Sequence, residues 1–290
     1  MKHLLTLILG LLLLVGCHST KRVNPQETIY VTIPPLKSLV QQIVGPNYPV
    51  EVLLPAGASP ESFELTARQM ADLSQSPLIF TIGLIDFEQN LLREFEQKGS
   101  VVNLGRRIKP IVGSCSHDHQ QGKISGRHGI DPHIWTSPKE LQRMASQIFT
   151  SVMELHPDSL HYKRNNLTTR TRLLTLDRIV SERIRQSGVR SFLIYHPAFS
   201  YYARAYGLEQ IAVEHEGKEP SARRVGELIR RAKEEGHRRI FYQSQFPAST
   251  VEVIASDLGA EPTPIDPLAE DIVSEILRFT DLLCETPLQE

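Results

Sequence analysis

Residues 159–187 read SLHYKRNNLTTRTRLLTLDRIVSERIRQS, a stretch without Gly or Pro. Apolar residues recur in it at helical spacing, among them Leu173, Leu176, Val180 and Ile184. Asp158 is a good N-cap residue, so the helix is expected to begin there. A helix of this length extends about 43 Å at 1.5 Å per residue, which is the diameter of a domain. It is therefore either one helix of an ordinary bundle or a strut that joins two lobes.

The sequence on both sides of this stretch favours the strut. Before it, β-branched runs alternate with helical patterns, and the same alternation returns after it. The predicted strands cover 29–33, 50–54, 78–82, 101–104, 191–195, 210–214, 239–243 and 262–265. The predicted helices between and after them cover 36–44, 67–74, 87–97, 198–206, 222–235, 250–258 and 271–284. Each β-α-β-α-β-α-β run favours a parallel sheet covered by helices.

The predicted fold is thus α/β, with two similar lobes joined by one long rigid helix. Each lobe is a mainly parallel four-stranded sheet flanked by helices and is expected to have its own core. A chain of 290 residues is long enough for two domains. The expected divisions are a signal peptide at 1–16, a polar tether at 17–27, an N-terminal lobe at 28–136 with a His-containing loop at 113–129, a helical segment at 137–188 and a C-terminal lobe at 189–290.

The N-terminus has the pattern of an export signal. Met1-Lys2-His3 is short and positive, and the apolar run 4–15 is too short to span a bilayer as a helix. It ends at Leu14-Val15-Gly16-Cys17, which resembles the lipobox of bacterial lipoproteins, where a peptidase cuts before the Cys and the thiol is acylated. An ordinary signal peptide with an incidental Cys is the alternative. We expect an exported protein, lipid-anchored at the cell envelope on its periplasmic or outer face.

The composition is that of an ordinary globular protein. A net charge of −1 with balanced acidic and basic residues gives no support to nucleic-acid binding. Arg223-Arg224 and Arg230-Arg231 lie between acidic residues at helical spacing and are interpreted as solvated helix faces. Export implies an oxidising setting. Cys115 and Cys284 could form one disulfide there, or Cys115, in Ser114-Cys115-Ser116-His117-Asp118-His119, could contact a metal.

Four candidate metal ligands lie where ligands of parallel sheets are usually found, beyond the carboxyl ends of strands. His196 follows the predicted strand 191–195, Asp266 follows 262–265, and Glu61 ends the loop after 50–54. His133 lies in Asp131-Pro132-His133-Ile134-Trp135, where Pro132 stiffens the backbone. Two carboxylates offset a 2+ ion and neutral imidazoles complete the set.

Each of these residues also has a structural interpretation. Asp266 could be a turn or helix-capping residue, Glu61 a solvated loop residue and His196 the cap of a strand. His133 could serve only to pack beside Trp135.

Taken in order, these motifs resemble the metal-binding lipoproteins of bacterial ABC importers for zinc and manganese, the cluster 9 solute-binding proteins. The resemblance covers about residues 28 to 285 and rests on four segments: Gly57-Ala58-Ser59-Pro60-Glu61-Ser62-Phe63-Glu64, Asp131-Pro132-His133-Ile134-Trp135, His196-Pro197-Ala198-Phe199-Ser200-Tyr201-Tyr202-Ala203 and Pro264-Ile265-Asp266-Pro267-Leu268. The resemblance implies two α/β lobes joined by a rigid helix. It also implies a cleft that holds a divalent metal for delivery to an ABC permease, with Glu61, His133, His196 and Asp266 as ligands.

This chain departs from the family pattern at Glu61, where the first ligand is normally His. Two nitrogens and two oxygens form a harder ligand set, which suits manganese better, although zinc accepts carboxylate oxygen. His117, His119 and His128 form a thin version of the His-rich loop of the family's zinc importers and are a possible auxiliary site. We expect zinc as the transported ion, with manganese as the alternative, and a monomer.

Two other functions are weighed against this one. An exported zinc hydrolase would need an open metal position and a general base, and the sequence contains no His-Glu-x-x-His motif. A surface adhesion protein could use the metal only structurally. A fourth protein ligand would close the site, so we expect a carrier and not an enzyme.

Overall fold

The computed structural model describes residues 24–95, 99–112, 129–214, 221–244, 246 and 248–285. The predicted signal peptide, Cys17 and tether residues 18–23 lie outside these ranges, as do His117, His119, His128 and Cys115. The last residues predicted as tether include a short 3-10 helix, η2 (Pro25–Glu27). None of the helices in the described part is both long and apolar enough to cross a bilayer.

The first sheet is parallel throughout, with the strand order β2-β1-β3-β4. Its strands are short and formed by β-branched and aromatic residues: β1 (Ile29–Val31), β2 (Val50–Val52), β3 (Ile79–Thr81) and β4 (Val101–Asn103). The connecting helices are α2 (Pro34–Val44), α3 (Ala67–Leu73) and α4 (Asp86–Phe95). Thr66 and Gln69 form a capping box that starts α3.

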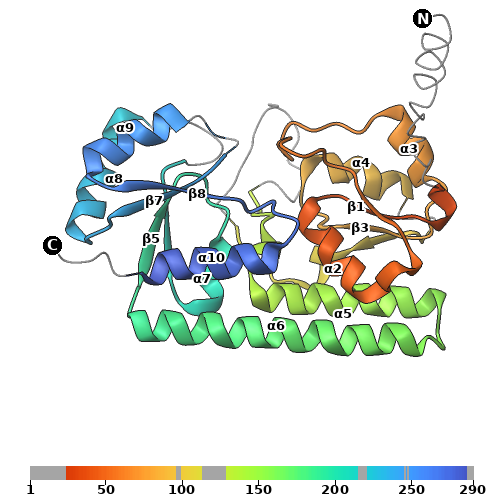
Figure 1. Ribbon diagram of the computed structural model, residues 1–290. Coiled ribbons are helices and arrows are strands. Elements are labelled where there is room, and N and C mark those ends of the chain that lie inside the picture. Colours follow the sequence, from red (N-terminus) through yellow and green to blue (C-terminus); the bar gives the residue numbers. More distant parts are fainter. Residues whose placement is uncertain are drawn as a thin grey trace, which may run out of the picture.

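The second sheet repeats this plan with the order β6-β5-β7-β8, again all parallel. Its strands are β5 (Ser191–Ile194), β6 (Glu209–Ala212), β7 (Arg239–Gln243) and β8 (Glu261–Ile265). The helices are α7 (Ser200–Tyr206), α8 (Ala222–Glu234), α9 (Ala248–Leu258) and α10 (Ile272–Cys284). The predicted fold class is confirmed: two similar parallel α/β lobes stand side by side (Figure 1).

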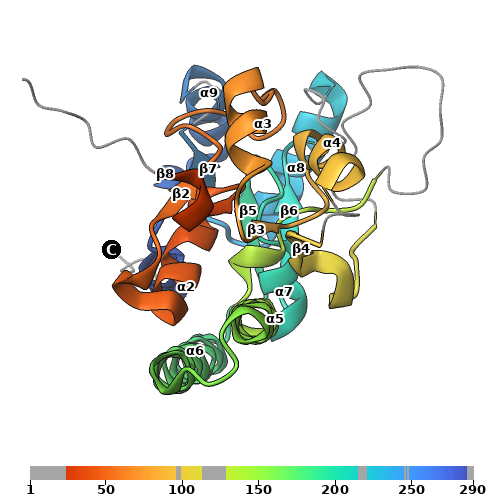
Figure 2. The same ribbon diagram turned by 90° about the vertical axis from the view of Figure 1, so that its right-hand side faces the viewer.

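The predicted strut is also present. Helix α5 (Pro138–Leu155) turns back into α6 (Leu160–Ser187), and α6 packs against α5, against α2 of the first lobe and against α10 of the second. Figures 1 and 2 show α6 running beneath both lobes, with α5 between it and the first lobe. The bundle alternative is therefore excluded. The predicted start is wrong by one residue, because the Oγ of Ser159, not Asp158, accepts the Tyr162 N–H at 3.3 Å.

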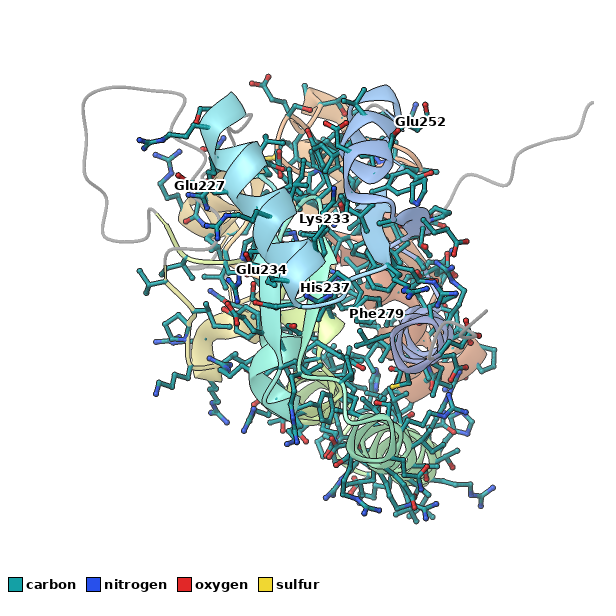
Figure 3. The ribbon with its side chains drawn as sticks, turned by 90° about the vertical axis from the view of Figure 1, so that its left-hand side faces the viewer. Glu227, Lys233, Glu234, His237, Glu252 and Phe279 are labelled. Atoms are coloured by element: carbon teal, nitrogen blue, oxygen red, sulfur yellow. The ribbon has the colours of Figure 1, made fainter. Side chains whose placement is uncertain are left out.

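The expectation that each lobe has its own core is wrong in part. One continuous apolar cluster includes Ile29 and Phe80 of the first sheet, Leu176 of α6, and Phe192 and Phe279 of the second lobe. Phe279, labelled on α10 in Figure 3, packs against four aromatic rings of the second lobe: Phe192, Phe199, Tyr202 and Phe241. Each lobe keeps only a smaller separate cluster of its own. The strut has an apolar face toward both lobes, and this joins their interiors.

Two surface predictions can also be compared with the structure. The Arg pairs of α8 form solvated ion pairs, with Arg230 at 3.2 Å from Glu234 and Arg231 at 2.6 Å from Glu235. Figure 3 shows Glu227 and Glu234 on the outward side of this helix. Cys284 is a free thiol at the end of α10, and Cys115, its possible disulfide partner, lies outside the described residues.

Candidate metal centre

Two histidines predicted as ligands meet between the lobes. His196 follows β5 and His133 precedes a short 3-10 helix, η6 (Ile134–Thr136). Their ring centroids are 5.1 Å apart, and the residues are 4% and 8% exposed. They border a cavity of about 40 Å³ together with Ser59, Pro60, Glu61, Trp135, Ala198, Gln243, Phe246, Pro267 and Leu268. This volume is enough for one ion or one water molecule.

Each imidazole is held by a buried carboxylate on its Nδ1 atom. Asp131 Oδ1 lies 2.8 Å from His133 Nδ1, and Glu214 Oε2 lies 2.8 Å from His196 Nδ1. A carboxylate in this position fixes the tautomer with the proton on Nδ1 and leaves Nε2 with its lone pair for a ligand. Burial alone would raise the pKa of Asp131, but the adjacent His133 ring and its hydrogen bonds hold that pKa below its ordinary value. The arrangement is typical of metal-binding histidines.

The two predicted carboxylate ligands are placed differently. Glu61 borders the cavity, with its Oε1 atom 3.8 Å from His196 Nε2 and its side chain 36% exposed. Asp266 follows β8 as predicted, but it is not among the cavity-lining residues, and its Oδ1 accepts the Leu268 N–H at 3.0 Å. Partial burial raises the pKa of Asp266. Over the described ranges, no three His, Cys, Asp or Glu side chains are close enough to form a metal cage. The structure therefore brings Glu61, His133 and His196 to one cavity and leaves Asp266 beside it.

The segment that carries His133 is bonded to both lobes. The Asp131 N–H donates to the Ile111 carbonyl at 2.9 Å, on the side of the first lobe. Trp135 Nε1 donates to the Pro267 carbonyl at 2.7 Å, Thr136 Oγ1 donates to the Ala198 carbonyl at 3.0 Å, and Tyr201 Oη donates to the Asp131 carbonyl at 2.8 Å. Trp135 thus connects the loop of one predicted ligand to the loop of another. The backbone under His133 is rigid for this reason.

Sequence reasoning missed several residues of this site. Glu214 is the carboxylate that orients His196, and it was not predicted. For Asp131, only the backbone and not the carboxylate was considered from the sequence. The ring of Phe246 stacks on His196 with 5.1 Å between centroids. The Oε1 atom of Gln243 is buried and has no hydrogen-bond partner among the described residues, while its Nε2 donates to the His196 carbonyl at 3.0 Å. A signal for Glu214 was available, because β5 and β6 are adjacent and their carboxyl ends carry His196 and Glu214.

Two parallel α/β lobes on a helical strut, with an ion-sized cavity and oriented imidazoles between them, define a two-lobed solute-binding protein. The chain belongs to the family described as zinc-uptake complex component A, periplasmic, whose model matches residues 29–281. This confirms the resemblance drawn from the sequence motifs.

Known relatives agree with this assignment. The zinc-binding lipoprotein AdcA of Streptococcus pneumoniae is 25% identical over 270 residues, which is 89% of this chain and 53% of AdcA. The chain thus spans about half the length of this relative. The high-affinity zinc uptake system protein ZnuA of Bacillus subtilis is 25% identical over 249 residues, covering 83% of this chain and 78% of ZnuA.

Solved structures show the same fold. A zinc-bound ZnuA with residues 138–173 deleted is 30% identical, covers 90% of this chain and 99% of its own, and superposes with a TM-score of 0.78. The Mn2+ complex of FpvC from Pseudomonas aeruginosa has a TM-score of 0.73, covers 89% of this chain and 97% of its own, and shares 23% identity. At that identity the likeness concerns the fold alone.

Proposed function

We propose that this protein is an extracytoplasmic solute-binding protein that captures a divalent transition metal between its lobes and delivers it to an ABC permease. The observation that carries the proposal is the pair of buried imidazoles, His133 and His196, each oriented by its own carboxylate. A carboxylate on Nδ1 makes each imidazole present its Nε2 atom as a donor to a metal ion at the edge of the cavity. The family description and the relative named for zinc uptake support import as the direction of transport.

The proposed ligands are His133, His196, Glu61 and Asp266. Glu61 Oε1 already lies 3.8 Å from His196 Nε2 and needs only a small movement to share an ion with it. Asp266 does not line the cavity, so its carboxylate would have to move to bind an ion there. The buried Oε1 of Gln243 is an acceptor that a metal-bound water could satisfy. The two ligand carboxylates neutralise a 2+ ion.

Zinc is the favoured cargo and manganese is the alternative. Zinc accepts imidazole nitrogen and carboxylate oxygen and exceeds manganese in affinity at most sites of this kind. Both the family description and the zinc-bound relative point the same way. The carboxylate at position 61 is the feature that favours manganese, because it replaces an imidazole nitrogen with a harder oxygen donor.

The remaining parts of the proposal concern the cell envelope. Cys17 is proposed to carry the lipid anchor after signal cleavage, and a membrane permease subunit is the proposed partner of the monomer. His117, His119 and His128 are proposed as a weaker auxiliary site. Its deletion, over 113–129, should lower total metal capacity and leave the tight site.

Metal content and competition test the proposal directly. The purified protein should contain about one tightly held divalent ion, and zinc should displace manganese in titration calorimetry. His133→Ala and His196→Ala should each weaken zinc binding at least about a hundredfold, while His161→Ala, at an exposed position on α6, should not change it. The apo protein should remain folded by circular dichroism.

Two results would contradict the carrier function. An apo protein that is unfolded would indicate a structural metal. Turnover of ester or peptide substrates by the zinc-loaded protein, lost in His196→Ala, would indicate the rival hydrolase.

A further inference from the structure

The strut helix has an unusual solvent face. Four of the six large apolar residues that the described structure exposes lie on α6 or at the end of α5, and three of them are spaced by seven: Leu160, Leu167 and Leu174. They are 75%, 67% and 54% exposed. Seven residues make almost two helical turns, so these leucines lie along one line. The buried face, with Leu173, Leu176 and Val180, points in the opposite direction toward the lobes.

The charges around this line have one sign. Between Ser159 and Leu176 the helix contains no Asp or Glu, and it presents four exposed cations: Lys163, Arg164, Arg170 and Arg172. Arg172 interacts with Gln42 and Asp271 at one flank. The nearest acidic residues along the chain, Asp158 and Asp177, lie before and after this stretch. Arg178 extends the basic line further along the same face.

Polar groups on the face are partly satisfied within the helix. Thr171 Oγ1 donates to the Leu167 carbonyl at 2.9 Å, and Thr168 Oγ1 donates to the Arg164 carbonyl at 3.3 Å. These hydroxyls can therefore leave water at less cost than unpaired ones. Leucines in line, flanked by Lys and Arg, are the pattern of a helix that lies in the interface of an anionic bilayer.

The start of the described chain lies near the first turn of α6, on the side of the first lobe. The described chain begins at Asn24. Burial raises the pKa of the Tyr48 hydroxyl, and the nearby Tyr162 and Glu27 raise it further, so the start of the chain lies close to Tyr48. Tyr48 bonds to His156 at 2.7 Å and Asn47 to Tyr162 on the first turn of α6 at 3.3 Å. The seven residues 17–23 extend at most about 25 Å. A lipid on Cys17 therefore keeps the start of α6 close to the membrane.

We propose that the α6 face formed by Leu160, Lys163, Arg164, Leu167, Arg170 and Leu174 docks on the anionic surface of the membrane that anchors the protein. This goes beyond the proposed metal transport and does not depend on it, because the face lies away from the cavity-lining residues. Arg and Lys attract the lipid headgroups, and the three leucines enter the boundary of the acyl chains. Docking holds the long axis of the strut parallel to the membrane.

Tryptophan quenching by brominated lipids tests this docking in the full chain reconstituted into vesicles. Leu167→Trp places an indole on the face, whereas the native Trp135 is buried and gives a low background. The matched control is Val253→Trp on α9, a position that is 64% exposed. In vesicles with about 30% phosphatidylglycerol, Leu167→Trp should be quenched strongly and Val253→Trp weakly. Quenching should fall in pure phosphatidylcholine and at high salt.

Charge reversal gives a second arm. Adding Arg164→Glu and Arg170→Glu to Leu167→Trp should lower the ratio of docked to undocked protein at least about 25-fold, about fivefold for each cation removed. Zinc binding of this variant should equal that of wild type, which separates this proposal from the proposed function. Equal quenching of Leu167→Trp and Val253→Trp overturns the proposal. So does protection of the Leu167→Trp indole by soluble polyglutamate but not by vesicles, which would assign the face to an acidic protein.

Discussion

At the scale of single residues, the departure at position 61 has a consequence that can be measured. Glu61 borders the cavity beside His196, so Glu61→Ala should weaken zinc and manganese binding. Glu61→His exchanges an oxygen donor for a nitrogen donor and leaves one carboxylate among the four proposed ligands. The His variant should favour zinc over manganese at least about tenfold more than wild type does, in competition titrations. Unchanged binding of both metals by Glu61→Ala would remove Glu61 from the ligand set.

Glu214 offers a test of the orienting carboxylates. Glu214→Gln keeps the shape but loses the charge that holds the Nδ1 proton of His196, so zinc affinity should fall about 10- to 100-fold. The control is Glu209→Gln at the start of β6, the strand that precedes Glu214; Glu209 is an exposed carboxylate paired with Arg231. If Glu209→Gln lowered zinc affinity as much as Glu214→Gln does, the effect would come from the loss of any negative charge near β6 and not from the orientation of His196. Rescue by Glu214→Asp of part of the affinity would support the positioning role.

The site was only partly predictable for a physical reason. His133, His196 and Glu61 follow strands or sit in a stiff motif, and strand ends meet in a parallel sheet. Glu214 and Gln243 also lie at strand ends, but carboxylates and amides are common there. Only their distances to His196, which the sequence does not give, identify them as residues of the site. Asp266 follows the correct strand, yet its carboxylate caps the next turn, which is the capping alternative weighed from the sequence.

At the scale of elements, α10 depends on its cap. Asp271 accepts the Ser274 N–H at 3.2 Å and lies 3.5 Å from Arg172 of α6. Burial raises the pKa of Asp271, but the Ser274 bonds and Arg172 outweigh it and keep that pKa below its ordinary 3.8. Stability from this carboxylate is therefore present above about pH 4 and is lost as the pH falls through the lower, folded pKa.

Two variants separate the cap from the charge. Asp271→Ala should lower the free energy of unfolding by about 1 kcal/mol at pH 7, and this difference should shrink as the pH falls from about 4 through the folded pKa. Asp271→Asn keeps a capping oxygen, so it should cost less. Urea unfolding monitored by circular dichroism at pH 7 and pH 3 measures both. A loss from Asp271→Ala that stays constant down to pH 3 would contradict the assignment.

The elements themselves were largely readable from the sequence. Short β-branched runs bounded by Gly and Pro form the eight strands of the two described sheets. The stretch 159–187, which contains no Gly or Pro, forms α6 and its N-cap. Helix ends were harder, as Ser159 shows, because neighbouring Asp and Ser are both good caps and only backbone geometry decides between them. The joined core was not predictable, since it depends on which faces of α6 meet which lobe.

At the scale of the whole molecule, the strut should fix the distance between the two halves of the metal site. Thr175→Pro, at an exposed position in the middle of α6, removes a backbone hydrogen bond and kinks the helix. It should cost about 3 kcal/mol of stability and weaken zinc binding about tenfold or more, although residue 175 does not line the cavity. Leu160→Pro, at the first position of the same helix, should be tolerated. Calorimetric titration and thermal unfolding measure both. Wild-type affinity in a folded Thr175→Pro protein would mean that the strut is only a spacer.

The joined core also has a consequence for how the chain matures. Phe279 of α10 lies 250 residues after Ile29, yet both belong to the same apolar cluster, so this cluster cannot close before α10 has been delivered. A polypeptide that emerges from a ribosome or a translocation pore with its N-terminal end first must therefore wait, with apolar surface uncovered, until α10 arrives. Loss of α10 by early termination or proteolytic trimming would thus leave this apolar cluster incomplete and open to degradation.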